Sequence, residues 1–159
     1  MWLANPKLMC DRHLLGEHVE IHMIVGSMRK QKRLDGFFNN RLIQLDAIYN
    51  RHQELVNEMQ ERGMDHNSPL DQKEIRKLSR KYKEFKNVDI DVESNIDDLC
   101  NRCSNCRKKT IEHFGENLQF VSNCCCGGVS EVASDGTARC KDCGEGCMAI
   151  PFLTKEDII

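Results

Sequence analysis

The fold of the first half of the chain is decided by residues 5–30, which read NPKLMCDRHLLGEHVEIHMIVGSMRK. Asn5 followed by Pro6 is typical of a helix start, because asparagine can cap the first turn and proline fits the first helical position. Apolar residues then recur at helical spacing, at Leu14, Ile21, Val25 and Met28. The pattern predicts an amphipathic helix over residues 7–30 whose apolar face packs into a core.

Further helices are predicted downstream. Residues 32–40 read as a connection, and apolar residues at positions 42, 45, 48, 55 and 59 predict a second helix that ends near Gly63. Asp71 can cap a third helix that extends to about residue 85, and a fourth is expected over residues 92–110. The first part of the chain is therefore expected to form a compact helical domain, residues 1–112.

The C-terminal part is instead rich in Gly, Ser, Thr and Cys. Short alternating stretches at residues 129–132 and 137–139 flank Ser134, Asp135 and Gly136, which together are typical of a hairpin turn. The expected fold class is mainly α, with the helical domain followed by a small β-rich zinc ribbon over residues 113–159.

Cysteine usage points to metal binding in a reducing compartment. Nine of the ten cysteines fall between Cys100 and Cys147, and such density indicates either disulfides in a secreted protein or metal thiolates in a reduced one. The first 32 residues have no apolar core of a signal peptide, and no stretch approaches the ~18 unbroken apolar residues of a membrane span. We therefore expect a cytoplasmic, zinc-binding protein with no membrane contact.

The predicted zinc ligands are Cys124, Cys126, Cys140 and Cys143. Each pair is followed by glycine, and short Cys-turn-Cys knuckles of this kind let backbone amides turn toward the sulfurs of a tetrahedral site. Cys125 and Cys147 are alternative ligands. A closed thiolate site of this type has a structural role and no catalytic one.

A second group, Cys100, Cys103 and Cys106, leaves two interpretations open. The three can join a second metal site, but on one continuous helix they fan out by about 100° per residue and cannot all face one ion. They can also be small buried residues at the end of the fourth helix. Cys10 stands apart from the other cysteines in the sequence.

The net charge of −2 conceals an asymmetry along the chain. Residues 1–86 carry 16 Lys and Arg against 12 Asp and Glu, whereas residues 110–159 carry 3 against 8. The basic excess of the front part permits phosphate contacts, but it is too small to indicate nucleic-acid binding by itself.

The polar face of the first helix carries His13, Glu17 and Glu20, at helical spacing away from the apolar stripe. The residues around this face, 5–22 and 25–30, resemble the phage and bacterial pyrimidine-dimer DNA glycosylase family. The resemblance continues through residues 51–70 and 99–107, and so covers about the first 110 residues. It implies a helical domain that removes damaged pyrimidines from double-stranded DNA.

Three catalytic residues follow from the resemblance: Met1, Glu20 and His13. The family uses its N-terminal α-amine as nucleophile and a glutamate of the first helix as acid and base. Glu20 matches this glutamate, and His13 matches the family's helix histidine. Since α-amines titrate near pH ~7.7–8.0, against ~10.4 for lysine side chains, such an amine can attack the sugar C1′ and form an imine at physiological pH. A bulky Trp2 is expected to protect Met1 from removal.

Two departures from the family pattern are Val19 and Met23, which stand where the family carries arginines around its glutamate. The expected DNA contacts are phosphate-binding and groove-facing side chains near the first helix: Arg12, His18, His22, Arg29, Lys30, Lys32 and Arg33. A second basic group lies on the third helix, at Arg76, Lys77, Arg80 and Lys81.

Two alternatives belong to other classes. His18 and His22, four residues apart on one helix, can chelate a metal ion, but the sequence offers no evident third ligand. The chain can also be a non-catalytic module that binds DNA, or a protein partner through its zinc ribbon, on an inherited glycosylase scaffold. Blocking the N-terminal amine distinguishes the two, because only an enzyme would lose its activity.

Overall fold

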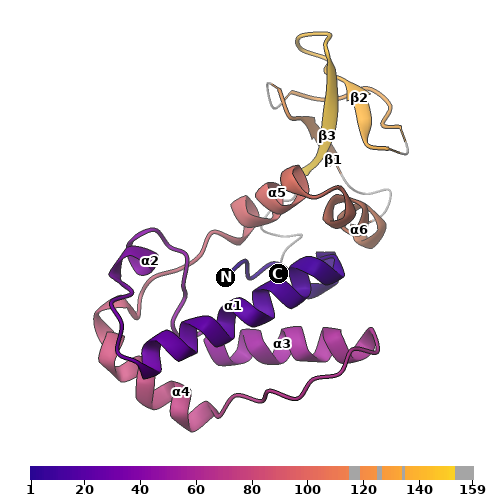
Figure 1. Cartoon of the computed structure of the whole chain (residues 1–159). Helices are drawn as coiled ribbons and strands as arrows, with labels where there is room; N and C mark the ends of the chain where they lie inside the picture. The colour runs from indigo at the N-terminus through magenta and orange to yellow at the C-terminus, as the bar shows by residue number, and fades with distance from the viewer. Residues whose placement is uncertain (115–118, 125–126, 134, 153–159) are drawn as a thin grey trace. The chain divides into compact units, whose positions relative to one another are not determined.

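A computed structural model of the chain describes residues 1–114, 119–124, 127–133 and 135–152. Helices dominate the first two thirds of the chain, and a small antiparallel sheet forms near its C-terminus (Figure 1), so the predicted fold class is confirmed. The chain divides into two compact units: Met1–Pro6 with Asp11–Asp91, and Lys7–Cys10 with Val92–Ile159. The boundary expected near residue 112 concerns independent folding and stays a prediction.

The first unit is built on α1 (Asp11–Arg29), which packs against α3 (Ile48–Glu61) and α4 (Gln72–Ser79). The predicted apolar stripe of α1 is fully buried, as Leu14, Ile21, Val25 and Met28 each have 0 % exposure. Because burying such side chains stabilises a fold by roughly 1.5–3 kcal/mol each, this stripe fixes which face of α1 points inward. The helix itself begins at residue 11 and not at 7, since Pro6–Leu8 forms a separate 3-10 turn.

The second predicted helix is shorter than expected. Residues 32–40 contain a short helix, α2 (Asp35–Asn39), where a plain connection was predicted. The following helix, α3, begins only at Ile48, so Leu42 and Leu45 lie in the loop before it. Leu42 is 50 % exposed whereas Leu45 is buried, which shows that the helical spacing of these two residues was accidental.

The third predicted helix begins where expected but ends early. Asp71 caps α4, as its side chain accepts a hydrogen bond of 2.8 Å from the backbone N–H of Lys73. After Ser79 the chain tightens into the 3-10 helix η2 (Arg80–Phe85), in which Tyr82 has non-helical backbone angles. The Tyr82 hydroxyl donates a 2.9 Å hydrogen bond to the carbonyl of Lys32.

In the second unit, the predicted fourth helix is two helices, α5 (Val92–Arg102) and α6 (Ser104–Phe114). The break falls at Cys103, although residues 102–104 contain neither Gly nor Pro. Both helices pack against strand β3 (Gly146–Phe152), with Ile96, Leu99 and Ile150 among the buried side chains.

The sheet has the strand order β1-β3-β2 and is antiparallel throughout. Its outer strands are β1 (Gln119–Ser122) and β2 (Thr137–Arg139). The expected strand at 129–132 contributes a single antiparallel bridge, Val129 to Cys140, beside β2. Of the predicted turn, Gly136 adopts a φ of +84°, which suits glycine, and Ser134 lies outside the described residues.

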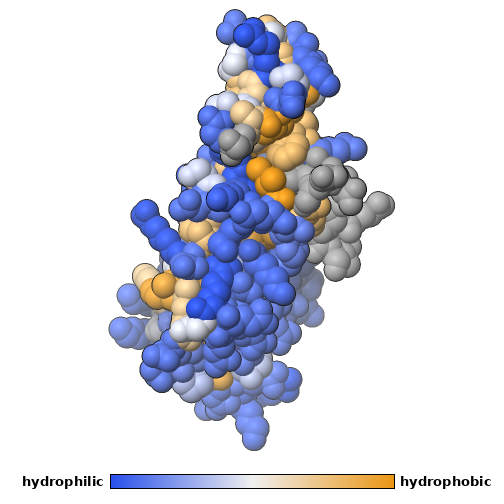
Figure 2. Space-filling model, turned by 90° about the vertical axis from the view of Figure 1, so that its right-hand side faces the viewer, coloured by the Kyte–Doolittle hydropathy of each residue, from blue (hydrophilic) through white to orange (hydrophobic). Residues whose placement is uncertain are grey.

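The surface of the first unit is predominantly polar. Figure 2 shows a mostly hydrophilic face over the lower part of the turned molecule, where α1, α3 and α4 lie in Figure 1. Within the described residues, no helix combines the length and the apolar character needed to cross a bilayer.

Candidate active site and metal centres

The N-terminal amine of Met1 lies beside the carboxylate of Glu20. The amine nitrogen is 3.3 Å from Glu20 Oε2 and donates a 2.9 Å hydrogen bond to the carbonyl of Leu42. The side chain of Met1 is buried and anchors the terminus, whereas the Glu20 side chain is 48 % exposed. The terminal amine and a solvent-accessible carboxylate therefore lie side by side at the surface of α1.

Glu17, one turn before Glu20, holds the first residues of the chain in place. Its Oε1 accepts hydrogen bonds from the backbone N–H groups of Trp2, at 2.8 Å, and Leu3, at 3.3 Å. Leu3 has a φ of +55°, in the left-handed region that bulky residues rarely adopt. A backbone held there must be fixed by its surroundings, and the two bonds to Glu17 do so.

Glu17 is in turn fixed by Arg51 of α3. The guanidinium binds both carboxylate oxygens, with Nε at 3.1 Å from Oε1 and Nη2 at 2.7 Å from Oε2, and it reaches Glu54 at 3.0 Å. Both Glu17 and Arg51 are 1 % exposed. A buried bidentate pair requires a defined position for both side chains. Because Glu17 also binds the backbone of Trp2 and Leu3, the pair links α3 to the position of the N-terminal amine.

Sequence reasoning placed Glu17 on the polar face of α1 and included Arg51 in the family resemblance, but it gave neither a role. The missing signal was burial, since a carboxylate and a guanidinium become partners only once α1 and α3 pack.

A half-buried Trp2 lies next to the site, with its ring edge-on to His13 at 6.4 Å between centroids. Val19 and Met23, which flank Glu20, are 54 % and 67 % exposed.

The predicted DNA-binding cations are exposed, but two of them hold carboxylates. Arg29 forms a bidentate pair with Glu74, with both bonds at 2.7 Å, and Arg33 lies 3.2 Å from Asp35. Arg12, Lys30 and Lys32 are exposed. Their contact with DNA stays a prediction.

A groove of about 410 Å³ lies along α4 and η2, and its wall is rich in cations. Arg76, Arg80, Lys83 and Lys86 line it together with Asp46 and Tyr49. The first two cations were predicted as phosphate contacts. The groove therefore offers several positive charges to a polyanion.

The C-terminal cysteines converge as far as the structure describes them. Ligand atoms of Cys124, Cys140 and Cys143 lie within 4.8 Å of one another, and the sulfurs of Cys124 and Cys143 are 3.5 Å apart. Tetrahedral zinc thiolates at ~2.3 Å require sulfurs about 3.8 Å apart, so the spacing suits a metal. Cys125 and Cys126 lie outside the described residues. Burial is the main cause that raises the pKa of Cys147, and the nearby thiols of Cys124, Cys140 and Cys143 raise it further.

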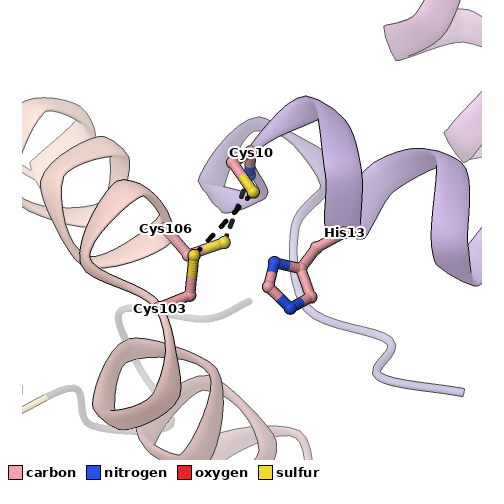
Figure 3. A group of neighbouring side chains, drawn as sticks. All are labelled: Cys10, His13, Cys103 and Cys106. Atoms are coloured by element: carbon pink, nitrogen blue, oxygen red, sulfur yellow. Dashed lines mark hydrogen bonds between the residues drawn. The ribbon is translucent and has the colours of Figure 1, made fainter.

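A second thiol group joins Cys10 to Cys103 and Cys106, as Figure 3 shows. The sulfurs of Cys10 and Cys103 are 3.9 Å apart, and the backbone N–H of Cys10 donates to Cys106 Sγ at 3.2 Å. Burial acts to raise the pKa of Cys103, but hydrogen bonds from Cys106 and Asn105 outweigh it and lower this pKa. Such N–H bonds to sulfur stabilise a thiolate, which is the form that binds metals.

The structure brings two of these three cysteines together, in agreement with the argument that all three cannot face one ion. With the break, Cys103 and Cys106 face the same neighbour, Cys10, which the sequence had set apart. Cys100 faces elsewhere: its thiol lies 3.4 Å from the Thr110 hydroxyl, and burial raises its pKa. Of the three cysteines considered for a second site, two therefore meet and one is a buried core residue.

The histidines of α1, His18 and His22, lie together with His52 and His66. His18 and His52 are buried, and the other two are half-buried. The two histidines that join His18 and His22 thus come from α3 and from the segment that follows it, and the sequence alone did not indicate them. DNA contact for either residue stays a prediction.

Comparison with known proteins concerns the first unit. Residues 1–72 match the family model described as pyrimidine dimer DNA glycosylase, which confirms the family resemblance over this part of the chain. No curated protein and no solved structure matches the chain.

Proposed function

From the match of residues 1–72 to the pyrimidine dimer DNA glycosylase family, we propose that the chain excises a damaged pyrimidine from duplex DNA and then cleaves the strand at the abasic site. The observation that carries this proposal is the 3.3 Å separation between the Met1 amine and Glu20 Oε2. A nucleophile that forms imines and a carboxylate that moves protons are the two groups this chemistry requires.

In the first step, the lone pair of the Met1 nitrogen forms a bond to the sugar C1′ while the C1′–N bond to the base breaks. The base leaves with the bonding electrons and takes a proton from water. Glu20, beside the amine, accepts the proton that the amine loses and passes it to the ring oxygen O4′ as the C1′–O4′ bond breaks, which leaves a protonated imine. Its negative charge also favours the positive charge that develops on the sugar.

In the second step, the same carboxylate removes a proton from C2′ of the imine. The electrons of that C–H bond form a C1′–C2′ enamine as the imine is neutralised, and the C3′–O bond then breaks with phosphate as leaving group. Water finally hydrolyses the imine and frees the amine. Reaching C1′ in a duplex requires a nucleotide to be extruded, at a cost of a few kcal/mol that damage lowers.

Glu17, Arg51 and His13 act as positioning residues in this proposal. Glu17 keeps the Trp2 and Leu3 backbone in place, so the amine cannot swing away from Glu20. The ring of His13 lies against Trp2, in the same short N-terminal arm. Exposed Val19 and Met23 flank the site, where the family pattern has arginines, and they favour apolar contact with a displaced base.

Zinc has a structural role in this proposal. Cys124, Cys140 and Cys143, with Cys126 as the predicted fourth ligand, hold one ion, and their spacing supports this. Cys10, Cys103 and Cys106 hold another. Closed sites of this composition stabilise folds and leave no open position for substrate.

The function is tested with Glu20→Gln on duplex DNA that carries a pyrimidine dimer or an abasic site. Strand cleavage should fall by at least about a hundredfold, the usual contribution of general acid–base catalysis, while DNA affinity stays nearly unchanged. The matched control is Glu61→Gln, on α3, which should retain cleavage. Equal cleavage by the Glu20 variant would refute the assigned role, and binding without any cleavage in the unmodified protein would indicate a non-catalytic module.

A further inference from the structure

Four histidines from three segments of the first unit meet at one point. His18 and His22 come from consecutive turns of α1, His52 comes from α3, and His66 follows α3 in the loop before α4. One ring nitrogen from each lies within 4.8 Å of those of the other three. Four of the six histidines of the chain are therefore gathered in one place, and the active-site chemistry uses none of them.

The distances among the rings match those around a tetrahedral ion. The Nε2 atoms of His22 and His52 are 3.2 Å apart. In each pair of these rings that includes His18 or His52, the two ring centroids are 4.7–5.2 Å apart. With metal–nitrogen bonds of about 2.0–2.1 Å, tetrahedral geometry requires ligand nitrogens about 3.3 Å apart and ring centroids about 5 Å apart.

A polar atom in the middle of this group also has no protein partner. Nε2 of His18 is buried and accepts or donates no hydrogen bond to any residue in the described part of the chain. Leaving such an atom unsatisfied costs roughly 1–3 kcal/mol, so native structures rarely do so without a reason. A bound cation would accept its lone pair.

Burial favours the neutral form, which is the form that ligates metals, in two of the four rings. Burial, followed by the neighbouring His22 and His66, lowers the pKa of His18 to about 4. Burial and the other three histidines likewise lower the pKa of His52 to about 4, against the opposing effect of a backbone hydrogen bond with Ser68.

We propose that His18, His22, His52 and His66 bind one divalent transition-metal ion of the zinc class, which clamps α1, α3 and the segment after α3 together. Imidazole nitrogen suits such ions. Two neighbouring side chains help to fix the orientation of the histidine rings. Gln53 Nε2 lies 3.1 Å from His52 Nδ1, and the Ser68 hydroxyl lies 3.4 Å from His66 Nε2. With four protein ligands the site is closed, which indicates a structural ion.

The test counts zinc in the full-length protein after loading and desalting. The half-buried pair is replaced in a His22→Asn, His66→Asn double variant, because His18 and His52 lie too deep for safe substitution. Elemental analysis should find one zinc equivalent per chain fewer in this variant than in the wild type. The matched control is His113→Asn, outside the group, which should lose none.

A second measurement separates metal loss from misfolding. In chelator, wild type and double variant should have similar melting temperatures, and added zinc should raise the melting temperature of the wild type more than that of the variant. Zinc X-ray absorption should show that nitrogen scatterers are lost while sulfur scatterers remain. An unchanged zinc count in a folded double variant would overturn the proposal, as would a zinc shift equal in both proteins.

Discussion

Arg51 brings a positive charge into the interior of the first unit at 1 % exposure. Its bidentate pair with Glu17 satisfies both groups, and Glu17 in turn holds the backbone of Trp2 and Leu3. Each buried charge is paired with the other, so removing one side chain leaves the opposite charge buried and unpaired. Stability and the placement of the N-terminal amine are therefore linked through one pair of side chains.

Arg51→Met should lower the free energy of unfolding by about 3–5 kcal/mol, because it leaves the Glu17 carboxylate buried and unpaired. Denaturant unfolding followed by circular dichroism measures this loss. Arg33→Met is the control, since the Arg33 side chain is 93 % exposed and its pair with Asp35 is screened by solvent. An Arg51 variant as stable as this control would show that the pair does not hold the site.

The sequence indicated the pair Met1 and Glu20, but it did not indicate the residues that hold this pair in place. The resemblance paired Met1 with Glu20, and the two lie 3.3 Å apart, although their roles stay predictions. It could not show that Glu17 would accept bonds from Trp2 and Leu3, because a helix pattern treats Glu17 and Glu20 as equal members of one polar face. Burial distinguishes them, and burial depends on the packing of α3.

At the scale of elements, the informative feature is the break between α5 and α6. Helical periodicity runs through residues 92–110 without Gly or Pro, so a single helix was the reasonable expectation. At this break, Cys103 and Cys106 contact Cys10, which lies more than ninety positions away in the sequence. Local patterns carry no information on such contacts, and for the same reason His52 and His66 were not foreseen beside His18.

Cys103→Ser should remove one zinc equivalent per chain, because it takes away one of three converging thiolates, whereas Cys100→Ser should remove none. The two cysteines are three residues apart, and the Cys100 thiol lies by the Thr110 hydroxyl. Elemental analysis of both variants, purified without chelator, gives the comparison. If both lost the same amount of zinc, Cys103 would have no special role as a ligand.

At the scale of the whole molecule, charge is divided along the sequence. Basic residues exceed acidic ones in residues 1–86, while residues 110–159 are acidic. Cations line the groove along α4 and η2, and Lys30 and Lys32 are exposed at the end of α1. DNA binding by this chain should therefore weaken steeply as salt rises, through contacts in the first unit.

Lys32→Ala should weaken binding to duplex DNA of any sequence and reduce the slope of log affinity against log salt by about 1, as expected for one lost phosphate contact. Fluorescence anisotropy over a salt series measures both quantities. Lys141→Ala, an exposed lysine of the acidic C-terminal part, is the control and should leave the slope unchanged. Identical slopes for Lys32→Ala and wild type would exclude this lysine from the interface.

Borohydride trapping tests whether the Met1 amine forms an imine with damaged DNA. The protein is incubated with UV-irradiated or abasic duplex DNA and the reductant, and covalent complexes are resolved by denaturing gel. We predict a trapped complex on both DNAs that disappears when the α-amine is blocked. No complex on either DNA with folded protein, or a complex that survives the block, would contradict the account.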